Sequence, residues 1–494
     1  MLSNTLAPWQ YTDATRPDYA RPEHNVALPD MTLVRDLLAG TRAMQARGSL
    51  YVPKWPDEDG EVHRMRYMGE PLFGAFSRIL DASVGKMFAT PPAIEWGARE
   101  TELRAQWDNI DAKGTKGEVA IRWFSRDALA DGLALILVDH PRAPEGEAVT
   151  LESQARLNLR PIWAFYTRQH VLSWRTDIVD NVEVLRSVTL YEPAREDFGS
   201  YGVQQVHRYR VLTLTPQGAT YEVWKKSLDE GQKEIFVREA EGVFRDARGN
   251  ALRTLPVAIA YTGPHPDILD VIPPLMPVAW ANLAHWRTSC ELTFGRSWSA
   301  IEQLVVIGEL ARGPDGKPVK VRKGWTEAIQ VQVGGDVKHV GPSGQALDQL
   351  VKGKTEKEQE MAALGLAFLT RETRAAETAE SKRIDAAAQD ATLATSAQGI
   401  EDAINLAWEH HLAYLGGTKA DAPVVTINRD YEQTAMDAQT MAAYVTAVRD
   451  AGIPVRLLLE AWQQGGRIPA GADLDALEGE SVAGLSIVRP ADGA

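Results

Sequence analysis

The chain of 494 residues is long enough for two to four domain-sized units, and its hydrophobic content of 44% is ordinary for a folded soluble protein. Its formal net charge of -14 disfavours a protein that grips nucleic acid by neutralising phosphates, although it does not exclude one that lets DNA slide past. The single cysteine, Cys290, excludes an intrachain disulfide and a zinc site built from several thiolates.

Helices are predicted in the first part of the chain. Residues 1–30, rich in Pro, Asn and Asp, indicate a loose arm, and apolar spacing then predicts a helix over Met31–Arg47. The acidic stretch Asp57–Gly60 lacks the ligand spacing of a calcium loop and is interpreted as a surface turn. A second amphipathic helix, between Leu72 and Met87, must end before Pro91-Pro92.

A sheet is predicted in the next part. Residues 101–128 have helical spacing, and Leu133–Val138 form the apolar core of a buried strand. After a polar linker over 142–158, hydrophobicity alternates with a period of two from 161 to 261, with a turn at Gly218. This alternation predicts a mainly antiparallel sheet region.

The stretch from 273 onward begins with a helix and a β-rich knob. Apolar residues at steps of three and four define one face of the helix: Leu275, Ala279, Leu283, Trp286, Cys290 and Phe294. Pro277 fits its opening turn, and Cys290 on this face is interpreted as a buried, inert thiol. Residues 308–344 are dense in Gly and Pro around short β-like runs such as Ile329–Val333, which is typical of tight turns between strands.

Helical spacing returns at Gln345 and continues with few breaks to Leu415. Gly353 weakens this pattern. Thr355 followed by Glu358 matches a capping box, which we interpret as the point where the helix restarts.

The last helix of this stretch, over 381–415, would be roughly 50 Å long at the standard rise per residue. Its apolar stripe consists of Leu393, Ala397, Ile400, Ile404, Trp408, Leu412 and Leu415. Because it has no strict heptad, we expect it to cross a large assembly rather than to form a coiled coil. Gly416-Gly417 provides a stop. Beyond it we expect a strand over Val424–Ile427, helices near Asp437–Asp450 and Val455–Gln464, and a poorly ordered end.

The usual enzyme signatures are absent from the sequence. Gly313–Pro318 only superficially resembles a phosphate-binding loop and lacks the helix behind it. His410-His411 lies near a helix end, where a cap-stabilising or surface role is favoured over a metal site. We therefore predict no catalytic residue, metal or cofactor. The short apolar run at Leu133–Val138 and the absence of a secretory pattern over Met1–Gln10 predict a soluble protein of the cytoplasm that does not bind membranes.

Two groups of charged residues, one in the knob and one further along the chain, each have two interpretations. Five basic residues gather in the knob, namely Arg312, Lys317, Lys320, Arg322 and Lys323. They form either a solvated surface or a docking surface for an acidic partner or DNA. Further along, four basic residues alternate with four acidic ones; the basic set is Arg371, Arg374, Lys382 and Arg383. This second group is either a helix face with i,i+4 ion pairs or a loop whose cations brush a polyanion.

Several short blocks share their order and spacing with a known family. They are Tyr51–Pro56, Val84–Phe88 with Pro91-Pro92, Gly132 with Leu137–Pro141, Arg160-Pro161 with Val171–Arg175, Pro274-Leu275 with Asn282–Trp286 and Thr288-Ser289, and Glu377–Glu380 with Arg383-Ile384. In this order they resemble the portal proteins, or head–tail connectors, of tailed bacteriophages, in a siphophage-type branch. The resemblance spans most of the chain, and it depends on the blocks together because each is weakly specific by itself.

The resemblance implies an α+β portal-type fold with an α/β wing, a two-helix stem holding a small β-rich clip, a long tunnel helix and a helical crown. By position, the parts would be an N-terminal arm (1–30), the wing (31–272), stem helix 1 (273–307), the clip (308–344), stem helix 2 (345–369), a tunnel loop (370–380), the tunnel helix (381–417), and the crown with the C-terminal tail (418–494).

The resemblance also implies a ring of identical copies, normally a dodecamer, at one vertex of the virion capsid. Double-stranded DNA would pass through its channel during packaging and ejection. The clip would dock the terminase large subunit and later the head–tail adaptor proteins, and the major capsid protein and scaffold are further implied partners. Arg371, Arg374, Lys382 and Arg383 are our expected DNA-facing residues, and the family has no catalytic residues to transfer.

Two alternatives stay open. One is a phage enzyme that processes nucleic acid without a linear motif, which would need a metal-binding cluster of carboxylates. The other is a different head–tail structural protein, such as an adaptor or a capsid component. The length of the chain and the order helix, knob, helix argue against the second alternative.

Overall fold

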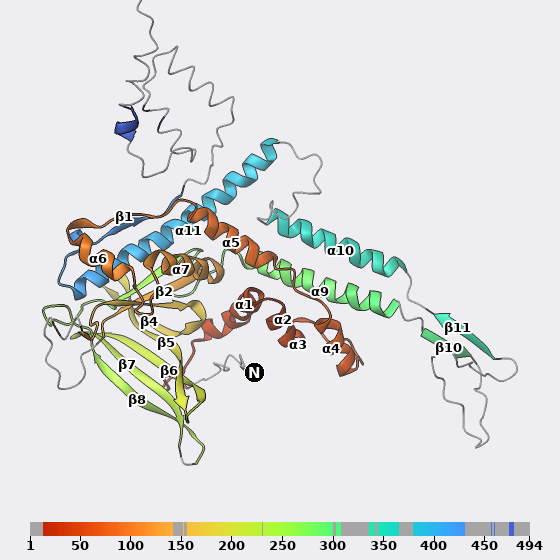
Figure 1. Cartoon of the computed structure of the whole chain (residues 1–494). Helices are drawn as coiled ribbons and strands as arrows, with labels where there is room; N and C mark the ends of the chain where they lie inside the picture. Colours follow the sequence, from red (N-terminus) through yellow and green to blue (C-terminus); the bar gives the residue numbers. More distant parts are fainter. Residues whose placement is uncertain are drawn as a thin grey trace, which may run out of the picture. The chain divides into compact units, whose positions relative to one another are not determined.

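The computed structural model describes residues 13–141, 152, 156–229, 231–299, 303–307, 335–340, 344–364, 379–429, 456, 459 and 474–478. These residues form helices and antiparallel sheets, which confirms the predicted α+β class. The chain divides into two compact units, Met1–Ile427 and Asn428–Ala494. All elements named below belong to the first unit (Figure 1).

The N-terminal part is helical from an earlier point than the sequence predicts. Its helices are α1 (Pro22–Ala39), α2 (Thr41–Ala46), α3 (Gly48–Tyr51), α4 (Gly60–Met68) and α5 (Ala75–Met87). The expected loose arm over 1–30 is therefore wrong for its last part, because Pro22 begins α1 at a position that tolerates the missing N–H. Gly40, with φ of 83°, separates α1 from α2. The predicted end before Pro91-Pro92 is confirmed by α5.

The predicted helix over 101–128 is two helices. They are α6 (Glu100–Trp107), which follows the short η1 (Gly97–Arg99), and α7 (Gly117–Asp131). The connection between them includes Gly114 with φ of 88°, a left-handed conformation that interrupts helical spacing. Gly132, also at positive φ, ends α7 immediately before the next strand.

A three-stranded sheet forms the buried centre of the first unit. Its order is β3 (Ile162–Thr167), β2 (Leu133–Asp139) and β9 (Val257–Tyr261), and both pairings are antiparallel. Leu133–Val138 is fully buried, which confirms the strand predicted from its continuous apolar run. Both α7 and the long C-terminal helix α11 (Ala379–Tyr414) pack on this sheet.

A five-stranded antiparallel sheet confirms the period-two alternation. Its order is β4 (Val171–Val179), β5 (Val182–Phe198), β6 (Gly202–Thr215), β7 (Gly218–Leu228) and β8 (Glu234–Val243). Gly218 follows the turn between β6 and β7, as predicted. The short η2 (Arg168–His170) joins β3 to β4.

The region predicted as a helix, a knob and a second helix contains α9 (Met276–Ser299), β10 (Gln303–Ile307), β11 (Asp336–Val340) and α10 (Gly344–Ala363). The predicted first stem helix, 273–307, is wrong at its end, because 303–307 is a strand that pairs with β11. Most of the predicted clip, including Ile329–Val333, lies outside the described residues.

The two later helices differ from their predictions in one respect. Thr355 does not restart a helix: α10 continues through it, and its hydroxyl donates to the carbonyl oxygen of Val351 at 3.1 Å. The predicted single helix over 381–415 is confirmed by α11, which has 36 residues and ends at Tyr414, just before Gly416-Gly417. Gly416 has φ of 73°, and the amide of Gly417 donates to Leu412 at 2.9 Å.

The end of the first unit is a short strand. After η3 (Lys419–Asp421), β12 (Val424–Thr426) confirms the predicted strand and pairs with β1 (Ala93–Glu95). The helices predicted near Asp437–Asp450 and Val455–Gln464 lie outside the described residues apart from single positions. Across the described parts, no helix combines the length and apolarity that spanning a bilayer requires.

Candidate functional site

The candidate site is the pair of helices α9 and α10 together with the β10–β11 pair between them in the chain. α9 and α10 lie side by side, and the β10–β11 ribbon follows at their joined end (Figure 1). His285 of α9 contacts Glu358 of α10, and a Cβ added at Gly295 would lie 3.0 Å from the side chain of Leu347. These two contacts show that the helices are antiparallel along their length.

One side of α9 is attached to the body through main-chain atoms. The buried amide of Asn282 donates to the carbonyl oxygen of Phe73 at 2.8 Å and accepts from the amide of Phe76 at 2.9 Å. Trp286, one turn further on, donates to the carbonyl oxygen of Glu70 at 3.2 Å. Since backbone groups that are buried need partners, these bonds fix where α9 runs along the segment before α5.

His285 lies between α9, α10 and Phe73. Its Nε2 is 3.3 Å from a carboxylate oxygen of Glu358, and its ring is 5.2 Å from that of Phe73. Burial lowers the pKa of His285, and the hydrogen bond to Glu358 offsets only part of this effect. His285 is therefore a neutral contact between the two helices at pH 7.

A second side of α9 contacts the chain around α3 and α4. The ring of Phe294 is 6.3 Å from that of Trp55 in an edge arrangement, and Arg287 donates to the carbonyl oxygen of Tyr51. Arg66 is fully buried, stacks 4.0 Å from the Trp55 ring and donates twice to Glu58. The acidic stretch Asp57–Gly60 is thus not only a surface turn, because Glu58 is buried in an ion pair.

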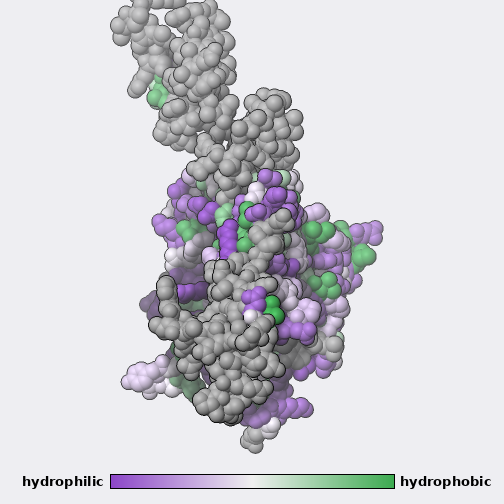
Figure 2. All heavy atoms as spheres, turned by 90° about the vertical axis from the view of Figure 1, so that its right-hand side faces the viewer, coloured by the Kyte–Doolittle hydropathy of each residue, from purple (hydrophilic) through white to green (hydrophobic). Residues whose placement is uncertain are grey.

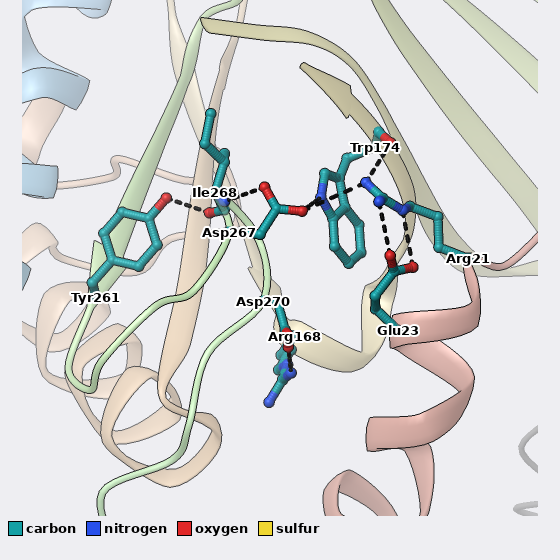
Figure 3. A network of polar contacts seen from close by, with 8 residues as sticks. All are labelled: Arg21, Glu23, Arg168, Trp174, Tyr261, Asp267, Ile268 and Asp270. Carbon is teal, nitrogen blue, oxygen red and sulfur yellow. Dashed lines mark hydrogen bonds and ion pairs between the residues drawn. The ribbon is translucent and has the colours of Figure 1, made fainter. Parts of the chain in front are cut away.

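The segment that leads into α9 is held by a polar network (Figure 3). Asp267 accepts from the indole of Trp174 at 3.1 Å and forms an ion pair with Arg21 at 3.7 Å. Arg168 of η2 donates to Asp270 at 2.7 Å and to the carbonyl oxygen of Val271 at 2.8 Å. These bonds join the five-stranded sheet and the start of α1 to the residues immediately before α9, so they fix the position from which α9 begins.

α11 packs closely on β9 through small residues. A Cβ added at Gly399 would lie 1.9 Å from the carbonyl oxygen of Tyr261, so only glycine fits at this point. Ser396 donates to the carbonyl oxygen of Thr262 at 3.1 Å. Ala403 and Ala407 continue the small surface at helical spacing and are buried.

The C-terminal half of α11 also completes an aromatic core. Four buried tryptophans have their ring centres within about 6 Å of a neighbour; they are Trp96, Trp107, Trp163 and Trp408. His411 lies against this cluster and is completely buried. The predicted surface or capping role of His410-His411 is therefore wrong, because both side chains are in the core. The missed signal for His411 was its spacing, because it lies three positions after Trp408 and four before Leu415, on the apolar stripe of the predicted helix.

Cys290 lies on the buried face of α9, as predicted. Burial raises the pKa of its thiol to about 12, so the reactive thiolate is scarcely populated at pH 7. Among the described residues, no three His, Cys, Asp or Glu side chains gather in a way that would hold a metal ion.

The predicted charged residues are mostly outside the described parts of the chain. All five basic residues of the knob, as well as Arg371 and Arg374, belong to this group. Lys382 and Arg383 lie in the first two turns of α11, but only their backbone is described. The placement of the four proposed DNA-facing residues is therefore untested, and their role stays a prediction.

Part of the sequence matches a known protein family. Residues 274–415 match a family described as "Domain of unknown function (DUF4055)", and the match begins just before α9 and ends just after α11. No curated protein matches the chain.

Among solved structures, a chain of the "Virion of native gene transfer agent (GTA) particle" is similar, with 11% identity and a TM-score of 0.37 over 83% of this chain and 94% of that chain. A chain of the "Neck of empty GTA particle computed with C6 symmetry" has 12% identity and a TM-score of 0.38 over 84% and 90%. A chain of the "Neck of native GTA particle computed with C12 symmetry" has 12% identity and a TM-score of 0.36 over 84% and 95%.

Proposed function

We propose that this chain is a portal-type structural protein of a phage-like particle, copies of which form a ring around a channel for double-stranded DNA. The observation that supports this function is the pairing of α9 and α10, whose joined ends lead to the β10–β11 ribbon. The long helix α11 follows α10 in the chain. The portal-like order of sequence blocks is consistent with the same function.

The surroundings of α10 are consistent with a further copy beside it. Among the described elements, its main contacts are with α9, and most of its other side chains are exposed. A polar helix that is supported on one side only is unusual in a small globular enzyme, whereas in a ring of identical copies the next subunit covers the other side.

In this proposal the parts of the chain have distinct partners. The described ribbon and the residues between its strands form the clip, where the terminase large subunit and then head–tail adaptor proteins dock. Residues 370–380 and the start of α11 face the DNA. The five-stranded sheet and the N-terminal helices belong to the wing, and the whole ring is a component of the virion next to the major capsid protein.

Electron microscopy of the purified full-length chain tests this function. Negatively stained particles are expected to be rings with an axial hole, with a single dominant copy number in class averages. A chain that stays monomeric across the accessible concentration range contradicts the proposal. The same preparation is also incubated with DNA and magnesium. DNA cleavage that accompanies the purified chain through every fraction would favour the enzyme alternative instead.

A further inference from the structure

We propose that copies of this chain associate head to tail through two named surfaces on opposite sides of α9. The first, called the basic face, consists of Arg42, Leu50, Arg64, Met65 and Met68 on α2, α3 and α4. The second, called the acidic face, consists of Asp348, Val351, Lys352 and Glu356 on α10. The inference rests on the proposed ring and names the surfaces that close it.

Helix geometry places the two faces on opposite sides of α9. His285, which contacts α10, and Phe294, which contacts Trp55, are nine positions apart. On a helix that turns about 100° per residue, they point in opposite directions. Arg287, which donates to Tyr51, points the same way as Phe294. Within one chain, α9 separates the basic face from the acidic face, so the two faces do not contact each other. The basic face of one copy is therefore free to contact the acidic face of another.

The two faces also lie at the same level along α9. His285 lies opposite Glu358, and Gly295 lies opposite Leu347. The two helices are antiparallel, so each step forward along α9 corresponds to one step backward along α10. By this register, Arg287 to Phe294 of α9 lie beside the first part of α10, from Asp348 to Thr355. A closed ring relates its copies by rotation alone. In the proposed ring α9 runs along the rotation axis, so surfaces at the same level along α9 lie at the same height and can meet between neighbouring copies.

The basic face combines two exposed arginines with exposed apolar side chains. Leu50 is 65% exposed, Met65 63% and Met68 43%, values that are high for large apolar groups. Gln45 of α2 donates to the carbonyl oxygen of Met68 at 2.8 Å, which joins α2 to the end of α4. Arg42 and Arg64 are exposed, and neither has an ion-pair partner in the described part of the chain. Glu61 is also exposed and lies one turn before Arg64 and Met65 on α4, so two cations and one carboxylate share this face.

The acidic face carries two carboxylates, with one lysine between them. Asp348, Lys352 and Glu356 follow at steps of four and so share one side of α10. Both acids are exposed and lack an ion-pair partner within the described ranges. Val351, at their flank, is 38% exposed, and the methylene groups of Lys352 add apolar surface next to it.

A contact between the two faces depends on opposite charges rather than on a large apolar surface. Viewed from the side on which the ribbon lies, the hydrophobic side chains of the described residues form small areas among hydrophilic ones (Figure 2). Small apolar contacts with charged groups around them are typical of interfaces whose specificity comes from electrostatic complementarity. A second copy of the chain carries both faces at the same position along α9, so it supplies the opposite charge for each of them.

Charge reversal tests the contact without removing buried groups. One variant is Arg42→Glu with Arg64→Glu, and the other is Asp348→Lys with Glu356→Lys. Each is expected to reduce the fraction of chains in rings by at least about tenfold, because like charges then face each other across every contact. The matched control is Arg175→Glu with Arg195→Glu, two exposed arginines of the five-stranded sheet, which should assemble as the unchanged chain does.

Mixing the two reversed variants distinguishes a broken contact from a damaged fold. In an equimolar mixture, each acidic face again meets a basic face, so rings of alternating copies should form. The chain with all four substitutions should also regain rings. The fraction in rings is measured by analytical ultracentrifugation, and ring shape by electron microscopy.

The outcomes separate this inference from the proposed function. If the unchanged chain forms rings and both reversed variants do so equally well, the named faces are not the contact, although the ring stands. If the reversed variants are monomeric and neither the mixture nor the fourfold variant recovers, the inference also fails. If the unchanged chain forms no ring, the proposed function and this inference fail together.

Discussion

The indole Nε1–H of Trp163 donates to Nδ1 of His411 at 3.3 Å, across the interface between β3 and α11. The other ring nitrogen of His411, Nε2, is 2.6 Å from the amide oxygen of Gln106. Because Nδ1 accepts one bond, the neutral ring must hold its hydrogen on Nε2 and donate it to Gln106. A single buried imidazole thus joins α6, β3 and α11.

Replacing this imidazole should destabilise the fold. In His411→Leu, the indole of Trp163 and the amide of Gln106 lose their partner in a buried site, which costs about 1–3 kcal/mol for such groups. We expect the urea midpoint, followed by circular dichroism, to fall accordingly. Gln217→Leu is the control, since Gln217 is exposed in the turn between β6 and β7 and its loss should change the midpoint little. Equal midpoints for the two variants would mean that the His411 bonds contribute nothing net.

Stability should fall as the pH is lowered from about 6.5. Burial lowers the pKa of four histidines: to about 4 for His24, His170 and His410, and to about 3 for His411. The unfolded chain takes up a proton on each near pH 6.5, whereas the folded chain resists until about pH 4. Since the unfolded state binds more protons in this window, the free energy of unfolding decreases across it.

Urea titrations at pH 7.5, 6.5, 5.5 and 4.5 test this dependence. The midpoint should fall slightly between the first two values, where the unfolded histidines begin to take up protons, and more steeply at each later step. In His411→Leu the fall should be shallower, because one buried group no longer takes part. A midpoint that rises between pH 6.5 and 4.5 would contradict the buried neutral state of these rings.

Two glycine-to-alanine changes should have opposite effects. In Gly399→Ala the new methyl group meets the carbonyl oxygen of Tyr261, so α11 must move away from β9, at a cost of about 1–3 kcal/mol. In Gly353→Ala nothing lies within 4 Å of the new group, and the helix α10 gains about 0.5–1 kcal/mol. Thermal unfolding of both variants is the measurement. A stabilised Gly399→Ala would show that α11 does not approach β9 so closely.

The elements that sequence patterns predicted best are those with strong periodicity. Leu133–Val138 is a continuous apolar run, and a strand that is buried on both faces needs one. α11 was predicted because its stripe keeps helical spacing through Ile400, Ile404 and Trp408, all of which are buried. In both cases one physical requirement, burial of a face, determines the pattern.

The errors arose where tertiary partners decide the outcome. Asp57–Gly60 looks like an exposed acidic turn, but Glu58 pairs with the buried Arg66 and Asp59 caps α4. Thr355 and Glu358 match a capping box, yet the helix continues because α9 supports it and Glu358 bonds to His285 instead. Small residues at 396, 399, 403 and 407 indicate that α11 packs closely against another element. The sequence does not identify that element, and the structure shows that it is β9, which Gly399 approaches.

The proposed DNA-facing residues give the last prediction. Replacing Arg371, Arg374, Lys382 and Arg383 with alanine removes four cations near the start of α11, where the proposed channel passes. Because weak phosphate contacts guide a duplex without trapping it, their loss should reduce the yield of filled particles or the retention of the genome while rings still assemble. The readouts are packaged DNA length on gels and ring images of the purified variant. The control removes four cations from the wing, at Arg122, Arg175, Arg195 and Arg245, and should leave packaging intact. Unchanged yield and DNA length in the first variant would show that these four residues do not guide DNA, whereas loss of rings would assign them to assembly instead.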